Sequence, residues 1–329
     1  MLVPVLLFLL GLVLLIKGGD WFVDGATGIA HRFRVPELLI GATVVSIGTT
    51  LPEVMVSAAS SVSGHGEIAY GNAIGSIICN TALIAAITAA VRPCETDRQS
   101  LKTPAAFFFV AAAFYMAVAY FFGQFSRITG AVLLSIFAVY MVITVTQAKK
   151  AGKSFKAAAE ESAEKASEEV PASQVAKDII LLVVGAALIA VGARLLVDNG
   201  TLIAKALGVP ESVIALTFVA LGTSLPELVT AITALAKGHG ALSLGNVVGA
   251  NLFNLVLVCG VSTVLAPFSV PVEKTVFGVN ASLAVDLPLM LGVMLFLTVP
   301  ALLRGKLARA QGIILLSVYA AFCTFQFVV

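Results

Sequence analysis

The chain has 329 residues, of which 59% are hydrophobic and only 12% are charged, and its mean hydropathy is +1.04. A soluble protein of this length carries about twice that share of charge, so the composition excludes a soluble globular protein and indicates a polytopic membrane protein. The net charge of +2 gives no reason to expect a nucleic-acid partner. No feature of the chain indicates an obligate protein partner.

Hydropathy predicts ten membrane-spanning helices, since a spanning helix needs about 20 residues of mainly apolar character. They run near 2–30, 36–62, 67–90, 104–122, 128–147, 176–205, 210–236, 241–265, 276–300 and 308–328. The N-terminus has no basic region and no small-residue cleavage site, so we expect it to be the first span and not a cleaved signal peptide. The segment 148–175 is rich in alanine and in charges of both signs, which predicts a solvated, partly helical linker.

Most lysines and arginines outside the spans lie in the loops that follow odd-numbered spans. The loops that follow even-numbered spans contain only Arg127, Lys205 and Lys274. Because basic residues gather on the cytoplasmic side, we predict that the linker is cytoplasmic and that both termini are extracytoplasmic.

The chain repeats itself after 174 residues. Residues 36–80 match residues 210–254 at 17 of 45 positions without a gap, and the matches include Gly, Pro, Glu, His and Asn. Each copy has five predicted spans, and because five is odd, the second copy inserts upside down relative to the first. Inverted repeats with interrupted helices are typical of secondary transporters.

We therefore predict an all-α integral membrane protein with ten transmembrane helices. They form two inverted-topology five-helix repeats in which helices 2, 3, 7 and 8 are discontinuous. The first repeat is 1–147 with its motif at 41–80, the cytoplasmic linker is 148–175, and the second repeat is 176–329 with its motif at 215–254.

One short stretch occurs in both repeats, inside the second and seventh spans. Residues 48–53 read GTTLPE and residues 222–227 read GTSLPE. A carboxylate inside a membrane is costly, about 3 kcal/mol at the centre of a span, so Glu53 and Glu227 indicate a site. The preceding prolines each remove a backbone hydrogen bond and free a carbonyl. Carboxylate and carbonyl oxygens are ligands for Na⁺ or Ca²⁺, so the two halves predict one shared cation site.

Other polar residues accompany each glutamate. On the second span a polar stripe at helical spacing contains Thr43, Ser46, Thr50, Glu53, Ser57 and Ser60. On the seventh span the stripe keeps only Thr217, Ser224 and Glu227, with Ala220, Ala231 and Ala234 at the other positions. With Glu53 in the stripe we favour a cation path, and packing of the hydroxyls between helices is the alternative.

The third and eighth spans supply asparagines at equivalent positions. Asn80 and Asn254 each follow their glutamate by 27 residues, and we predict that they are ion ligands or partners of the glutamates. For Asn72 and Asn246 the sequence leaves open a ligand role or a bridge to backbone at the helix breaks. The four cysteines have no metal-ligand or disulfide spacing. We expect no cofactor.

These motifs resemble those of a known family. GTTLPE with GNAIGSIICN, and GTSLPE with GNVVGANLFN, resemble the two α-repeats of the cation/Ca²⁺ antiporters, and among them the sodium/calcium exchangers of prokaryotic type. The resemblance covers nearly the whole chain, including the ten spans and the central loop. It implies an integral protein of a prokaryotic plasma (inner) membrane that exchanges Na⁺ for Ca²⁺, with no enzymatic activity.

The resemblance also implies a ligand set. Glu53 and Glu227 would bind Ca²⁺ together with the backbone carbonyls of Thr49 and Thr223. Overlapping Na⁺ sites would be completed by the carbonyls of Ser46 and Ala220, the hydroxyls of Thr50, Ser224 and Ser76, and the amides of Asn80 and Asn254. Spans 1 and 6 would slide against the other spans to alternate access.

The chain departs from the family pattern at two positions. Asn254 stands where the potassium-dependent exchangers have aspartate, which argues against K⁺ coupling. Ala250 replaces the serine usual after Gly249, so one Na⁺ hydroxyl ligand is missing.

Two other transport reactions compete with Na⁺/Ca²⁺ exchange. In an H⁺/Ca²⁺ antiporter the glutamates would carry protons, but the TTLPE and TSLPE stretches differ from the GNxxE-type signature usual in proton-coupled relatives. A Ca²⁺-permeable channel would use the same oxygens, and the inverted repeat argues against it. An intramembrane enzyme would need a nucleophile–base pair or paired catalytic aspartates, and the sequence contains no convincing motif for either.

Overall fold

The protein is described by a computed structural model that covers residues 2–93, 95–161, 172–207, 222–272, 275–276 and 278–328. Side chains are described throughout these ranges except at 150–161, 172, 204, 327 and 328. The protein is an all-helical membrane protein, and the strands that the structure describes are pairs of residues in loops.

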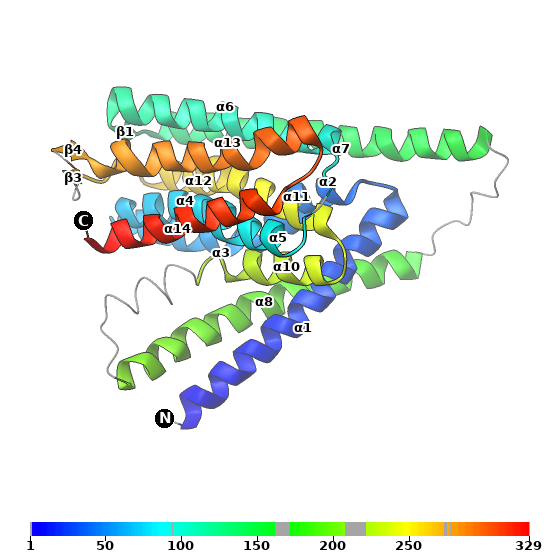
Figure 1. The fold of residues 1–329 in the computed structure, drawn as a ribbon, viewed down its shortest axis with the longest axis horizontal. Coiled ribbons are helices and arrows are strands. Elements are labelled where there is room, and N and C mark those ends of the chain that lie inside the picture. The colour runs from blue at the N-terminus through cyan, green and yellow to red at the C-terminus, as the bar shows by residue number, and fades with distance from the viewer. Residues whose placement is uncertain are drawn as a thin grey trace.

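Helices of the first half of the chain lie side by side with helices of the second half in one bundle (Figure 1). The helices of the first half are α1 (Leu2–Phe33), α2 (Glu37–Ile40), η1 (Gly41–Val45), α3 (Ser46–Val62), α4 (Gly66–Cys79), η2 (Asn80–Ala85), α5 (Ala86–Val91), α6 (Arg98–Phe122) and α7 (Arg127–Glu161). The segments labelled η are π-helical and continue directly into the neighbouring α-helices. π-Helical turns inside α-helices are rare and are frequent at functional sites.

The second half adds the remaining helices. They are α8 (Ala172–Ala206), α10 (Leu225–Ala236), α11 (Gly240–Phe253), η4 (Asn254–Val258), α12 (Cys259–Leu265), η5 (Ser282–Asp286), α13 (Leu287–Arg304) and α14 (Arg309–Val328). The strands are β1 (Gln124–Phe125), β2 (Phe268–Ser269), β3 (Thr275–Val276) and β4 (Val279–Asn280). β1 pairs with β2 and β3 with β4, both antiparallel.

The predicted spans agree closely with the helices. In the described part of the chain, eight helices are long and apolar enough to cross a membrane, and α10 and α14 lie where the seventh and tenth spans are predicted. Two starts differ by six residues: the helix predicted from 104 begins at Arg98, and the span predicted from 276 begins at Ser282, because 275–280 contain β3 and β4. The linker predicted at 148–175 is helical to Glu161 in α7, and α8 begins at Ala172.

Local sequence explains where α6 begins and ends. The Asp97 side chain precedes the helix and accepts a hydrogen bond from the backbone N–H of Gln99 at 3.0 Å, as an N-cap does. Gly123 ends the helix with φ +66°, a left-handed conformation that glycine adopts without steric cost. Gly305 ends α13 in the same way, with φ +69°.

Loop contacts group the helix ends into two faces. On one face β1 and β2 join the loops before α7 and before η5. On the other, the backbone N–H of Thr96 bonds to the carbonyl of Gly305, and His239 on the α10–α11 turn contacts Glu37 at the start of α2. The grouping matches helices that cross the membrane in alternating directions. Which face is cytoplasmic stays a prediction from the basic residues.

α1 and α8 lie side by side and antiparallel, inclined to the rest of the bundle (Figure 1). Glycines line their contact: a methyl group added at Gly18 would lie 2.8 Å from the backbone nitrogen of Ile189 and 2.9 Å from the carbonyl oxygen of Gly185. Gly11 faces Gly192 in the same manner. The two backbones therefore touch, which small residues permit between membrane helices.

Candidate functional site

Glu53 in α3 and Glu227 in α10 are both 0% exposed. Their carboxylates lie close enough for the charge of Glu227 to act on Glu53. Neither oxygen of either carboxylate has a hydrogen-bond partner in the described residues. Burying a carboxylate without a partner is costly, so this arrangement is built for something other than stability.

Glu53 lies where α3 lacks a backbone hydrogen bond, and Glu227 lies in the first turn of α10. Pro52 lies inside α3 and cannot donate the hydrogen bond that the carbonyl of residue 48 would accept. Pro226 occupies the first turn of α10, where its fixed backbone angle suits a helix start. Each glutamate follows its proline directly, so both carboxylates sit beside backbone that lacks a regular helical partner.

Hydroxyl groups surround the carboxylates. Thr50 is 0% exposed and its hydroxyl has no partner in the described residues. The side chains of Thr49 and Thr50 approach the Glu227 carboxylate from the first half of the chain, without the geometry of a full hydrogen bond. The hydroxyl oxygens of Ser224 and Ser76 lie 3.4 Å apart. The first half of the chain thus lines the carboxylate of the second.

Asn80 and Asn254 begin the π-helical segments η2 and η4. Both are 0% exposed, and neither the amide oxygen nor the amide nitrogen of either residue has a partner in the described residues. Buried polar atoms usually have hydrogen-bond partners. Two equivalent asparagines with free oxygens are consistent with ligands of a cation.

Two further asparagines join the halves of the chain. The Asn246 amide oxygen accepts a hydrogen bond from the hydroxyl of Thr49 at 3.3 Å, and the Ser46 hydroxyl, whose nearest acceptor is the Gly41 carbonyl at 2.7 Å, lies 3.4 Å from it. The Asn72 amide oxygen accepts one from the hydroxyl of Thr223 at 3.1 Å. The sequence alone leaves the role of these asparagines open, although their equivalent positions in the two repeats mark them as related.

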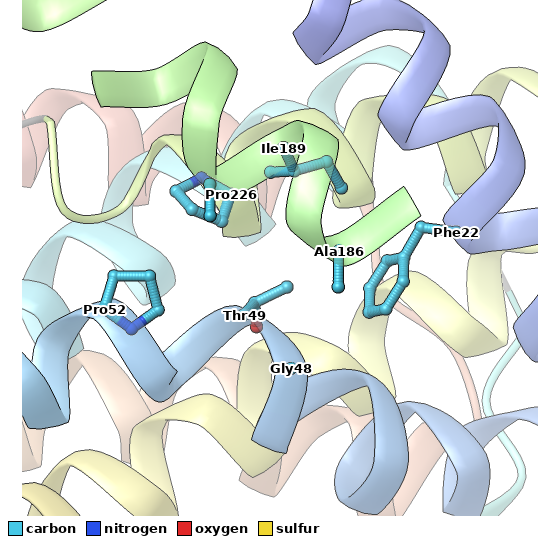
Figure 2. A pocket seen from close by; sticks show the side chains of 8 residues that line it. Phe22, Gly48, Thr49, Pro52, Ala186, Ile189 and Pro226 are labelled. Carbon is cyan, nitrogen blue, oxygen red and sulfur yellow. The ribbon is translucent and has the colours of Figure 1, made fainter. Parts of the chain in front are cut away.

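A small pocket separates these helices from the α1–α8 pair. Figure 2 shows Pro52 and Pro226 on one side of it and Phe22 on the other. Its remaining lining residues are Gly48, Thr49, Ala186, Ile189 and Ala190. Thr49 contributes both to this pocket and to the surroundings of Glu227, so the pocket adjoins the site.

The structure brings most of the predicted positions together. The contacts above connect Glu53, Glu227, Thr49, Thr50, Ser46, Thr223, Ser224 and Ser76, and Asn80 and Asn254 are buried at the turns described. Ala220 lies outside the described residues. In the described part of the chain no group of three or more His, Cys, Asp or Glu side chains is placed to hold a metal. A cation here would depend on two carboxylates and neutral oxygens, a donor set that suits Na⁺ and Ca²⁺.

Apolar spanning helices around a buried, oxygen-rich centre define an integral membrane protein with two carboxylates buried between its helices. A family model described as "Sodium/calcium exchanger protein" matches residues 3–146 and 177–328. The chain belongs to this family, which is a family of exchangers and not of enzymes.

Individual relatives agree with the family. Sodium/calcium exchanger MaX1 of Methanosarcina acetivorans is 32% identical over 98% of this chain and 98% of its own. An uncharacterized membrane protein of Methanocaldococcus jannaschii is 37% identical over 95% of this chain and 94% of its own. Among solved structures, the sodium-calcium exchanger NCX_Mj soaked with 10 mM Na⁺ and zero Ca²⁺ matches with a TM-score of 0.80 and 35% identity, over 97% of each chain.

Proposed function

We propose that the protein exchanges Na⁺ for Ca²⁺ across a prokaryotic plasma membrane by alternating access through one cation site shared by both halves. The observation that carries this proposal is the pair of fully buried carboxylates, Glu53 and Glu227, which come from different halves and have no protein partner in the described residues. A divalent cation, or several Na⁺ ions, would neutralise them.

The proposed Ca²⁺ ligands are the carboxylates of Glu53 and Glu227 with the carbonyls of Thr49 and Thr223. For Na⁺ we propose the carbonyls of Ser46 and Ala220, the hydroxyls of Thr50, Ser224 and Ser76, and the amide oxygens of Asn80 and Asn254. Glu53, Glu227, Thr50, Asn80 and Asn254 are buried, and their side-chain oxygens have no partner in the described residues, which supports their part of this assignment. All are oxygen ligands, which hard cations prefer.

We propose that the chain is built from two inverted five-helix repeats, 1–147 and 176–329, joined by a cytoplasmic linker, with both termini extracytoplasmic. The reciprocal contacts Thr49–Asn246 and Thr223–Asn72 support the repeat, because a shift of 174 residues converts one into the other. Breaks in helices 2, 3, 7 and 8 would free further carbonyls. Pro52 and the π-helical segments η1, η2 and η4 support this feature.

Obligatory exchange follows from the cost of the empty site. Without a cation, two carboxylates would face each other in a medium of low dielectric constant, and movement of that site across the membrane would be unfavourable. Bound Ca²⁺ or Na⁺ removes this cost, so loaded forms move and the empty form does not. The α1–α8 pair, which packs as one unit beside the pocket, is the proposed moving part.

An H⁺/Ca²⁺ antiporter is the second candidate, and the same carboxylates favour it because a buried carboxylate can also be neutralised by a proton. The neutral oxygens around them favour Na⁺, since a proton needs no set of hydroxyl and amide ligands. A Ca²⁺ channel would need a continuous path, whereas both carboxylates are 0% exposed.

The test is Ca²⁺ uptake into liposomes that contain the purified protein and Na⁺, after dilution into Na⁺-free buffer. Controls have equal Na⁺ on both sides or a pH gradient alone. Glu53→Gln removes a proposed ligand, and Glu67→Gln is a matched control because Glu67 is an exposed glutamate on α4.

Uptake that needs the Na⁺ gradient, disappears in Glu53→Gln and persists in Glu67→Gln would establish the proposal. Uptake that follows the pH gradient and ignores Na⁺ would replace it with the proton antiporter. Uptake with neither gradient would indicate a channel.

A further inference from the structure

We propose that Asn72 and Asn246 are positioning residues that hold Thr223 and Thr49 of the opposite half, and thereby fix the spacing of the backbone carbonyls at these threonines. The inference deepens the proposed function, because it rests on the assignment of those two carbonyls to Ca²⁺. Neither Asn72 nor Asn246 is among the proposed Ca²⁺ and Na⁺ ligands.

Asn246 is 0% exposed and lies on α11. Its amide oxygen accepts from the Thr49 hydroxyl at 3.3 Å. The Ser46 hydroxyl lies 3.0 Å from the Asn246 backbone carbonyl, but its nearest acceptor is the Gly41 carbonyl at 2.7 Å. The first turn of α3 is therefore attached to α11 chiefly through Thr49. Thr49 also approaches the Glu227 carboxylate, so this attachment is next to the proposed ions.

Asn72 makes the corresponding attachment from α4. Its amide oxygen accepts from Thr223, just before α10, at 3.1 Å. Its amide nitrogen donates to the Ser57 hydroxyl at 2.8 Å and to the backbone carbonyl of Glu53 at 3.4 Å. The Asn72 side chain thus contacts α3, which contains Glu53, and also the residues just before α10, which contains Glu227.

The hydroxyls of Thr49 and Thr223 reach the other half of the chain. Several other threonines bond only within their own helix, as Thr298 does to the carbonyl of Met294 at 2.6 Å and Thr27 to that of Val23 at 2.8 Å. This local bond is the usual one for a helical threonine. The Thr49 hydroxyl has such a local acceptor in the Ser46 carbonyl at 3.4 Å, and it also reaches Asn246 at 3.3 Å, 197 residues away in sequence. The Thr223 hydroxyl donates to Asn72 at 3.1 Å, 151 residues away.

A hydroxyl held in this way restricts its own residue. The Thr49 carbonyl is separated from its hydroxyl by only a few covalent bonds, so a fixed hydroxyl limits where the carbonyl can lie. Ion ligands must be held within a few tenths of an ångström to select between cations of similar size. Two equivalent attachments would set the distance between the carbonyls of the two halves.

The test compares Thr49→Val and Thr223→Val with Thr49→Ser and Thr223→Ser in the full-length protein in liposomes. Valine keeps the shape and the backbone carbonyl but removes the hydroxyl, and serine restores the hydroxyl. We expect each valine variant to raise the Ca²⁺ KM by about five- to tenfold, the effect of one buried hydrogen bond, with a smaller change in kcat. The serine variants should keep the KM of the unaltered protein.

Double variants identify the partners. If Asn72 acts through Thr223, Asn72→Leu combined with Thr223→Val should raise the KM no further than the larger single effect. The same holds for Asn246→Leu with Thr49→Val. Thr298→Val is the matched control, since it removes a buried hydroxyl that bonds within α13, and it should leave the Ca²⁺ KM unchanged.

An unchanged Ca²⁺ KM in both valine variants, or fully additive effects in the double variants, would overturn the inference while leaving Na⁺/Ca²⁺ exchange intact. Thermal unfolding of the same variants in detergent separates the two proposals. If the unaltered protein shows no Na⁺-dependent uptake, the proposed function fails, and non-additive unfolding temperatures would still support the two attachments.

Discussion

The α1–α8 pair and the helices around Glu53 and Glu227 are held together by different kinds of contact. In the α1–α8 pair, backbones touch through Gly11, Gly18, Gly185 and Gly192. Around the glutamates, side-chain hydrogen bonds join α3, α4 and α11 to segments of the opposite half. Close backbone packing makes a stiff unit, whereas hydrogen bonds between polar side chains set the positions of individual atoms.

This difference supports the α1–α8 pair as the proposed moving part. The pair contacts the site helices at the pocket wall, through ion pairs of Lys237, and at Gly19, where an added methyl group would lie 2.8 Å from the side chains of Val229 and Thr233. Lys237 on the α10–α11 turn reaches Asp24 on α1 at 2.8 Å and Asp20 at 3.4 Å. Contacts between apolar side chains and partly exposed ion pairs cost little to exchange for others, as the proposed shift of this pair beside the site requires.

The largest expected effect is at the site itself. Glu227→Gln removes one of two buried carboxylates, and because losing one member of a buried charged arrangement costs about 3–5 kcal/mol, Ca²⁺ uptake should fall at least about 100-fold. The folded protein should not lose stability in Ca²⁺-free buffer, since the carboxylate has no partner in the described residues. Uptake assays and thermal unfolding measure the two quantities.

Ca²⁺ binding supplies the control for this prediction. A ligand at 100 times its Kd stabilises the folded state by about 2.7 kcal/mol, so Ca²⁺ should raise the Tm of the unaltered protein and not that of Glu227→Gln. A variant that unfolds at much lower temperature without Ca²⁺ would instead assign Glu227 a structural role.

The next effect concerns the glycine contact between α1 and α8. Gly18→Ala would place a methyl group 2.8 Å from the Ile189 nitrogen, so we expect a loss of about 1–3 kcal/mol of stability and slower exchange. Gly292→Ala on α13 is the matched control, because an added methyl group there meets nothing within 4 Å. Alanine is the better helix former, so this control should gain up to about 1 kcal/mol. Thermal unfolding that shifts equally in both variants would contradict the tight contact.

A smaller effect is expected at the ion pairs that join the two regions. Lys237→Met removes the contacts with Asp20 and Asp24, which would have to break whenever α1 shifts. Partly exposed pairs contribute about 0.2–1 kcal/mol, so exchange at low salt should become up to about fivefold faster, and the gain should fade at high salt. Initial rates in liposomes at two salt concentrations measure this.

The control for Lys237 is Arg194→Met. Arg194 pairs with Asp198 at 3.6 Å within α8, so removing this pair breaks no ion pair between helices. Equal rates for Lys237→Met and the unaltered protein at low salt would show that this contact does not restrain the exchange cycle.

Much of the fold could be predicted because membrane spans are visible as apolar runs and a repeat is visible as matching residues. Apolar runs located the helices to within a few residues at most ends, and the 174-residue shift identified equivalent positions in the two halves. The start of the ninth span failed, since residues 275–280 are apolar enough to extend a span but pair as β3 and β4. The π-helical turns were not predicted, because one extra residue per turn leaves no pattern in composition.

The site was predictable as a set of residue types and not as a set of contacts. Glu53 and Glu227 stood out because carboxylates are rare in spans. The partners of Asn72 and Asn246 could not be read in the same way, because those contacts join residues 151 and 197 positions apart. The sequence marked both asparagines through the repeat, but only the packing of α4 and α11 against the opposite half of the chain decides which hydroxyl each one meets.

The smallest expected effect comes from a difference between the two half-sites. Ser76 lies beside Ser224, but its equivalent in the second half is Ala250, which is 0% exposed on α11. Ala250→Ser would restore a hydroxyl at the equivalent position of the proposed Na⁺ sites, so the Na⁺ concentration for half-maximal exchange should fall roughly two- to fivefold, the scale of one neutral oxygen contact. The Na⁺ dependence of Ca²⁺ exchange measures it, with Ala301→Ser, which adds a buried hydroxyl to α13, as the control. If Ala250→Ser leaves the Na⁺ dependence unchanged or shifts it only as much as Ala301→Ser does, the two half-sites differ in sequence without differing in how they bind Na⁺.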